Sequence, residues 1–144
     1  MNRRWTVSLG LLLLLPGCSL FRPHPRPEMA PPEEAARYKF PIALPTEGQQ
    51  ILSGPIAAAV SLAMEDFLPL GHTPPRDASP MELCALRRES YDVTAVPGSD
   101  DGVVFVSFSP RESACRDLQG PSRSDTPIVY AVDVGRSRIL SVQK

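Results

Sequence analysis

Apolar residues recur every three to four positions through residues 54–68, which is the spacing of one face of an α-helix. The apolar pairs stand at 51–52, 55–56, 59–60, 63–64 and 67–68. Pro55 is tolerated in a first helical turn, and Pro69 with Gly71 ends the pattern. The sequence therefore predicts a main helix over 54–68 whose apolar stripe packs against a core.

From residue 89 onward the apolar period changes to two, which is the period of a β-strand. Four segments show alternating or β-branched and aromatic character, at 89–96, 103–109, 127–134 and 138–143. Turn-forming residues at 97–102 separate the first two segments, and Gly135 with Arg136 separates the last two. The chain is therefore expected to end in two β-hairpins.

A short second helix is predicted just before the first strand. Ser79 suits an N-cap, Pro80 suits the first helical position, and Glu82 stands where a capping box needs an acid. This helix would carry Cys84. A helix followed by four strands in two local hairpins predicts an α+β fold, with one main N-terminal helix packed on a four-stranded antiparallel sheet.

The start of the chain has the three regions of a secretory signal. Two arginines precede the apolar run 6–15, and the small residue Gly17 stands directly before Cys18. The run is only about half of the roughly 20 residues that a membrane-crossing helix needs, which disfavours a retained transmembrane segment. Residues 1–17 are therefore expected to be a signal peptide that is removed.

Residues 15–18, Leu-Pro-Gly-Cys, resemble the lipobox of bacterial lipoproteins, in which a leucine stands three positions before the cysteine. The resemblance implies a diacylglyceryl group on the Cys18 thiol, cleavage after Gly17, and acylation of the new amino group. The residue after the cysteine is Ser19 and not an aspartate, which is similar to members of the family that are sorted to the outer membrane. The resemblance therefore implies an anchor in the periplasmic face of the outer membrane. An ordinary signal peptide with a cysteine nearby is the alternative.

Residues 18–45 are predicted to be a lipidated cysteine followed by a proline-rich tether. They hold seven of the 17 prolines, and because proline lacks an N–H and fixes φ, this stretch is expected to be extended and semi-rigid. A proline-rich ligand for an aromatic groove is the alternative. Tyr38, Phe40, Ile42 and Leu44 stand at alternate positions, which predicts a short edge strand.

Length and charge limit the classes of protein that fit. Residues 46–144 are enough for one small α+β domain, and 144 residues in all exclude a multidomain enzyme. The chain has 15 Lys and Arg against 16 Asp and Glu, and no basic cluster remains without residues 1–17. Nucleic acid is therefore not expected as a partner.

Cys84 and Cys115 are the two cysteines left once Cys18 is acylated. In an exported small domain two cysteines most often pair, and closing a loop of about 30 residues stabilises a fold by roughly 3 to 4 kcal/mol in the chain-entropy model. A redox or nucleophilic pair is the alternative, although the spacing is not Cys-x-x-Cys. We predict a structural disulfide.

The polar residues form no catalytic constellation in the sequence, and we expect no cofactor, metal or catalytic residue. The two histidines are His24 in the tether and His72 in a proline-rich loop. A metal site would need His72, Asp77, Glu82 and Cys84 to converge through an unusual loop geometry. The remaining candidates are interpreted as a solvated helix face (Glu65, Asp66), turn residues (Asp100, Asp101) and hairpin-loop glycines (Gly98, Gly102).

The order of one helix and four strands resembles cystatin-like and PepSY-like α+β domains, and residues 130–142 look like a PepSY closing hairpin. We expect a membrane-anchored periplasmic lipoprotein whose small, non-catalytic domain binds another envelope protein. The resemblance implies an alternative, in which the domain inhibits or assists an envelope protease or hydrolase.

Overall fold

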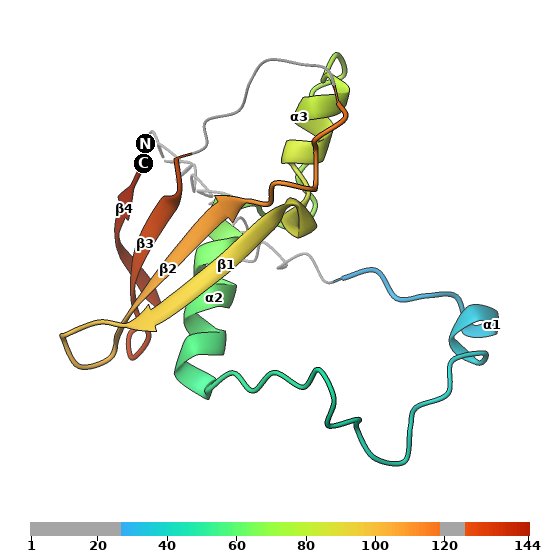
Figure 1. Cartoon of the computed structure of the whole chain (residues 1–144), viewed down its shortest axis with the longest axis horizontal. Coiled ribbons are helices and arrows are strands. Elements are labelled where there is room, and N and C mark those ends of the chain that lie inside the picture. The colour runs from blue at the N-terminus through green and yellow to red at the C-terminus, as the bar shows by residue number, and fades with distance from the viewer. Residues whose placement is uncertain (1–26, 119–125) are drawn as a thin grey trace, which may run out of the picture.

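The computed structural model describes residues 27–118 and 126–144, and these form an α+β protein with a four-stranded antiparallel sheet and a few helices (Figure 1). The helical segments are α1 (Pro32–Ala35), α2 (Gly54–Phe67), α3 (Pro80–Ala85) and the 3₁₀ turn η1 (Arg88–Ser90). The strands are β1 (Tyr91–Pro97), β2 (Val103–Pro110), β3 (Ile128–Asp133) and β4 (Arg138–Gln143). The predicted fold class and both predicted hairpins are confirmed.

The strands lie in the order β1-β2-β3-β4, and every neighbouring pair is antiparallel. This order follows from local connections, since a hairpin brings consecutive strands side by side. Val93 lies opposite Phe108, which belongs to the same face as Val106 two residues earlier. The β3–β4 pairing shifts register between Ala131 and Val132, which marks a β-bulge at that end of the strand order.

The helix α2 covers one face of the sheet and encloses the core between helix and strands (Figure 1). Ala59 and Ala63 are one turn apart and fully buried, and their small side chains let α2 approach the strands closely. The buried residues of the sheet are Tyr91, Val104, Val106, Phe108, Tyr130 and Val132. Phe67, in the last turn of α2, stacks on Phe108 with ring centroids 4.7 Å apart.

Two expectations about helices are changed by the structure. The described residues hold four helical segments, where the sequence predicted one main helix and a short second one. They exclude residues 1–26, so the position of the main helix at the N-terminus is not supported. The prediction of a wholly extended tether is wrong at α1, a single helical turn. Its first residue is Pro32, and proline fits the first helical position because the N–H it lacks would have no helical partner there.

The edge strand predicted at residues 38–44 does not form. The segment lies in neither helix nor strand, its large apolar side chains are exposed, and the four-stranded sheet does not include it. Alternation decides which side chains would share a face, but it does not supply a partner strand. The segment therefore leaves apolar side chains in solvent.

The predicted export segment lies outside the described residues. This applies to residues 1–17, to the predicted cleavage and acylation site at Gly17 and Cys18, to Ser19 and to His24. Within 27–118 and 126–144, no helix combines the length and the apolar character that crossing a bilayer requires.

Candidate functional site

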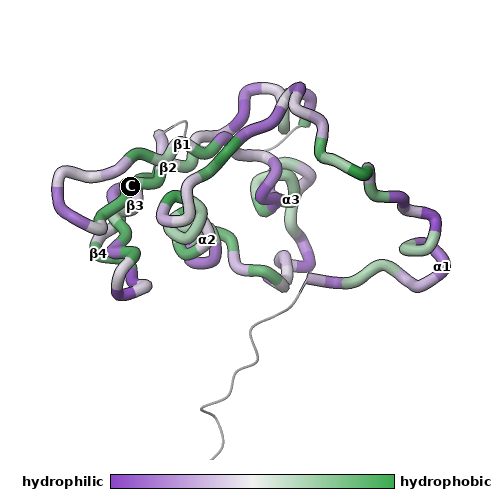
Figure 2. Tube along the Cα trace, turned by 90° about the horizontal axis from the view of Figure 1, so that it is seen from below, coloured by the Kyte–Doolittle hydropathy of each residue, from purple (hydrophilic) through white to green (hydrophobic). Residues whose placement is uncertain are grey.

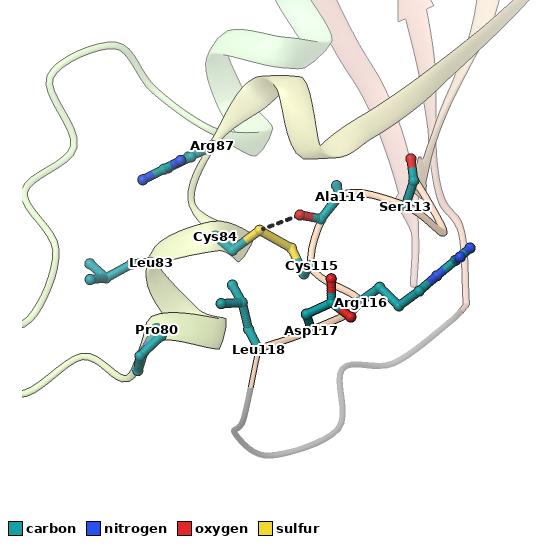
Figure 3. A pocket seen from close by; sticks show the side chains of 10 residues that line it. All are labelled: Pro80, Leu83, Cys84, Arg87, Ser113, Ala114, Cys115, Arg116, Asp117 and Leu118. Carbon is teal, nitrogen blue, oxygen red and sulfur yellow. Dashed lines mark hydrogen bonds between the residues drawn. A yellow bond between two sulfur atoms is a disulfide. The ribbon is translucent and has the colours of Figure 1, made fainter.

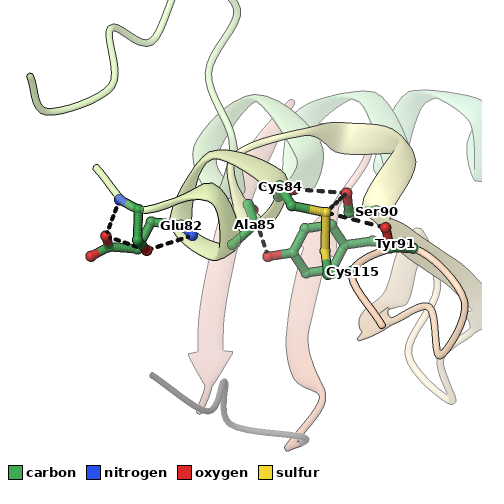
Figure 4. The surroundings of a disulfide bond; sticks show 8 residues. Glu82, Cys84, Ala85, Ser90, Tyr91 and Cys115 are labelled. Atoms are coloured by element: carbon green, nitrogen blue, oxygen red, sulfur yellow. Dashed lines mark hydrogen bonds between the residues drawn. A yellow bond between two sulfur atoms is a disulfide. The ribbon is translucent and has the colours of Figure 1, made fainter. Parts of the chain in front are cut away.

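Cys84 and Cys115 are brought together from two distant parts of the chain. Cys84 is on α3 and Cys115 is in the loop after β2, and their Sγ atoms lie 2.07 Å apart (Figure 4). The Ser90 hydroxyl donates a hydrogen bond of 2.7 Å to the carbonyl oxygen of Cys84, which is buried. The disulfide therefore ties α3 to the loop after β2, and it joins the two cysteines that the sequence predicted would pair.

A depression of about 380 Å³ lies beside this disulfide. Leu83 and Leu118 contribute apolar side chains to its lining, and the Cys84 sulfur lies 3.3 Å from the Ala114 carbonyl oxygen (Figure 3). Arg87 also lines the depression, but its side chain extends away from the sulfur atoms (Figure 3). Because the two sulfurs are bonded to each other, neither is a thiolate nucleophile in this state.

The sequence predicted a solvated face for Glu65, and its side chain is 33% exposed while its carboxylate also holds the end of α2. Its Oε2 forms a 2.7 Å ion pair with Arg88, and its Oε1 accepts a 3.2 Å hydrogen bond from the N–H of Leu70. The same arginine donates from Nε to the Leu68 carbonyl oxygen at 2.8 Å. Arg88 thus satisfies a carbonyl group that the end of the helix leaves without a helical partner.

Asp66 is exposed, as the sequence predicted, and it also has a structural partner. Its Oδ2 accepts a 3.2 Å hydrogen bond from the hydroxyl of Tyr130, which is buried on β3. Burial, and then the charge of Asp66, raise the pKa of Tyr130 to about 12. The neutral phenol is therefore the stable form, and it fastens α2 to the middle of the sheet.

The four residues considered for a metal site do not converge. Glu82 accepts a 2.8 Å hydrogen bond from the N–H of Ser79 in the capping box of α3, and Cys84 is in the disulfide. His72 lies exposed in the loop after α2. In the part of the chain that the structure describes, no group of three or more His, Cys, Asp or Glu side chains could hold a metal ion.

The two hairpin turns lie next to each other at one end of the sheet. The N–H of Val134 donates to the Gly102 carbonyl oxygen at 3.0 Å, and the turns border a depression of about 550 Å³. In the second turn Asp133 accepts from the N–H of Arg136 and pairs with Arg138, each at 3.1 Å. Gly102 has a φ of +76°, as a turn glycine does, and Gly98 pairs within the hairpin.

The face of the sheet opposite α2 is open among the described residues, with the helix on the other side of the strands (Figure 2). We call this surface the outer face, and on β1 to β3 its members are Asp92, Thr94, Val96, Val103, Phe105, Ser107, Ser109, Val129, Ala131 and Asp133. Val96, Phe105 and Ala131 lie opposite one another in register and form an apolar row. Val96 is 49% exposed and Phe105 is 41% exposed.

A row of hydroxyl groups, Thr94 and Ser107, runs beside the apolar row of the outer face. An exposed aromatic residue with polar neighbours is a common feature of protein-binding surfaces. This surface was not predicted from the sequence. The sequence does contain a signal for the outer face, in the run at 103–109. Positions 103–106 are all apolar, so apolar residues occupy both faces of the strand there and do not alternate with polar ones.

No family model matches this chain, and neither a search of curated proteins nor a search of solved structures found a match.

Proposed function

We propose that this protein is a lipoprotein, anchored in the periplasmic face of the outer membrane, whose non-catalytic domain binds another envelope protein. In this proposal the domain spans residues 46–144, with α2 as the main helix and α3 as the short second helix before β1. Residues 18–45 are the lipidated cysteine and the tether. The observation that carries the binding function is the open outer face of the sheet with its apolar row.

The anchor is supported by the signal-like segment that ends at Cys18. Metabolic labelling with palmitate should mark the protein, and Cys18→Ala should abolish the label and release the protein from the membrane fraction, whereas Ser61→Ala should change neither. Unaltered labelling in Cys18→Ala would overturn the anchor. Replacing Ser19 with Asp should move the protein from outer to inner membrane fractions.

Binding to a protein is supported by the shape and chemistry of the outer face. A four-stranded sheet presents a broad surface, its apolar row supplies contact area, and the neighbouring hydroxyls can form hydrogen bonds. A side chain that is exposed in the free protein costs little stability when it is changed. Phe105 can therefore be altered while the fold is kept, which separates loss of binding from loss of structure.

The experiment is a pull-down from detergent-solubilised envelopes with the wild type, with Phe105→Ser and with Leu70→Ser. Leu70 is an exposed apolar residue in a loop, so its variant is a matched control for the outer face. A partner that the wild type and Leu70→Ser recover, and that Phe105→Ser loses, would support the proposal. Equal recovery by all three proteins, or recovery of nothing beyond the Cys18→Ala background, would overturn it.

A second candidate function is inhibition of, or assistance to, an envelope protease or hydrolase. The adjacent turns at residues 98–102 and 135–138 favour it, because two neighbouring loops can be presented together to an active-site cleft. Changing Asp101→Lys together with Arg136→Glu should then alter the hydrolase activity of envelope extracts, while Phe105→Ser should not. Unchanged activity in a deletion strain would count against this candidate.

A further inference from the structure

Residues 38–44 place four large apolar side chains in solvent. Tyr38 is 73% exposed, Phe40 86%, Ile42 110% and Leu44 76%. They alternate with Lys39, Pro41 and Ala43, so in an extended strand all four would lie on one face. An exposed apolar face of this size indicates a surface that another chain covers.

The proline at position 41 limits this segment to one pairing edge. In a strand, the N–H and C=O groups of alternate residues point to opposite edges. Phe40 and Ile42 keep their N–H groups and point to one edge, whereas Pro41, which has no N–H, points to the other. The segment can therefore form a full ladder only through the residues that also carry the apolar side chains.

The hydrogen bonds at the two ends of β1 show which of its residues turn their backbone groups away from β2. The N–H of Gly98 donates to the Val103 carbonyl oxygen at 2.8 Å, and the N–H of Arg111 donates to the Ser90 carbonyl oxygen at 2.9 Å. Both bonds belong to the β1–β2 register, so the even-numbered residues of β1 turn their backbone groups toward β2. The odd-numbered residues turn theirs to the other side.

Val93 and Ala95 therefore present N–H and C=O groups at the edge of the sheet, since β1 is the first strand in the order. Their side chains are on the face that α2 covers, and Val93 remains 41% exposed there. The strand at the opposite edge of the sheet, β4, pairs with β3 in an irregular register. The edge of β1 is therefore the more regular one for an added strand.

The segment and the β1 edge match in two respects. An antiparallel strand added at β1 pairs through residues whose side chains lie on the α2 face, and the apolar residues of 38–44 are the set that can pair. Pro41 then faces outward, where no ladder bond is needed. Lys39 falls on the opposite face, where Asp92 already forms a 3.0 Å ion pair with Arg111, so the match rests on hydrogen bonding and apolar contact.

We propose that residues 38–44 of one copy add as an antiparallel strand to the β1 edge of a second copy. In the single chain the segment is exposed and unpaired with the sheet, so the acceptor is assigned to another molecule. Each chain carries both the donor and the acceptor, and reciprocal exchange closes a symmetric dimer with no donor left over. The proposal goes beyond the function proposed above and does not depend on it.

Proline substitutions test the pairing edge. We would measure sedimentation equilibrium of the detergent-solubilised full chain over a hundredfold range of concentration. Ile42→Pro removes an N–H on the pairing edge and should raise the dimer dissociation constant about tenfold or more. Ala43→Pro removes an N–H on the outward edge and should change it by less than about threefold. A monomer at every concentration, or equal effects of the two variants, would overturn the proposal.

Cysteine cross-linking tests whether the strand joins two molecules. A chain with Val93→Cys would be mixed with a chain carrying Phe40→Cys or Ile42→Cys, and oxidised. Paired residues have Cβ atoms about 5 Å apart, so at least one mixture should give a covalent dimer in about fivefold higher yield than the Lys39→Cys control. A double variant that cross-links only within one chain, with no dimer in the mixtures, would show that the segment pairs with its own sheet and would overturn the proposal.

Discussion

Removal of the Cys84–Cys115 disulfide is expected to cost this domain much of its stability. The two cysteines are 31 residues apart, and the loop-closure entropy for that separation corresponds to about 3.7 kcal/mol at 25 °C. Small domains are stable by only about 5–15 kcal/mol in all. The double variant Cys84→Ala with Cys115→Ala is therefore expected to unfold roughly 15–30 °C below the wild type.

The assay is urea unfolding followed by far-UV circular dichroism, with and without reductant. The wild type under reductant should match the double variant, because both lack the same cross-link, and reductant should not affect the double variant. Ser113→Ala, an exposed change in the same loop, is the control and should stay within about 0.5 kcal/mol of the wild type. A loss below about 1 kcal/mol in the double variant would refute the reasoning, because it would mean that the loop is not free in the unfolded reduced chain.

Three further predictions concern single side chains. Phe108→Ala should lower the free energy of unfolding by about 3–5 kcal/mol, whereas Phe105→Ala on the outer face should lower it by less than about 1 kcal/mol, as measured by urea unfolding. Arg88→Met should lower the free energy of unfolding by about 1–2 kcal/mol. Its ion pair with Glu65 is one-third exposed, so most of the loss comes from the hydrogen bond to the Leu68 carbonyl oxygen at the end of α2. Most of that cost should therefore persist in about 1 M NaCl. In a spectrophotometric titration one tyrosine phenol should ionise near pH 12, and this transition should be absent in Tyr130→Phe. Because the pKa of this phenol is raised on folding, the stability it contributes is present below pH 10 and is lost between about pH 10 and pH 12.

Features that depend on neighbours in the sequence were predictable. The four-residue repeat around Ala59 and Ala63 indicated α2, because residues four apart share a helix face. The capping residues Ser79 and Glu82 indicated the start of α3, since a capping box involves only four consecutive residues. The hairpins followed in the same way from their turns.

Contacts between distant residues were not predictable from the same patterns. Glu65 and Arg88 are 23 residues apart, and Asp66 and Tyr130 are 64 apart. On a helical wheel both acids fall on the polar side of the apolar stripe, so their expected partner was water. The partners come from the path of the chain after α2 and from the position of β3, and no local period contains either piece of information.

The segment at residues 38–44 shows the same limit in a strand. Its alternation predicted an edge strand that does not form in the single chain. The edge with which such a strand could pair depends on which residues of β1 turn their N–H and C=O groups away from β2, and only the sheet register provides that information. A strand added at β1 lies in the plane of the sheet, so it lengthens the outer face and does not cover it. Dimer formation and partner binding through Phe105 are therefore compatible, and separate variants should affect them independently. Phe105→Ser should leave the dimer intact, and Ile42→Pro should leave recovery of the partner by the monomer unchanged.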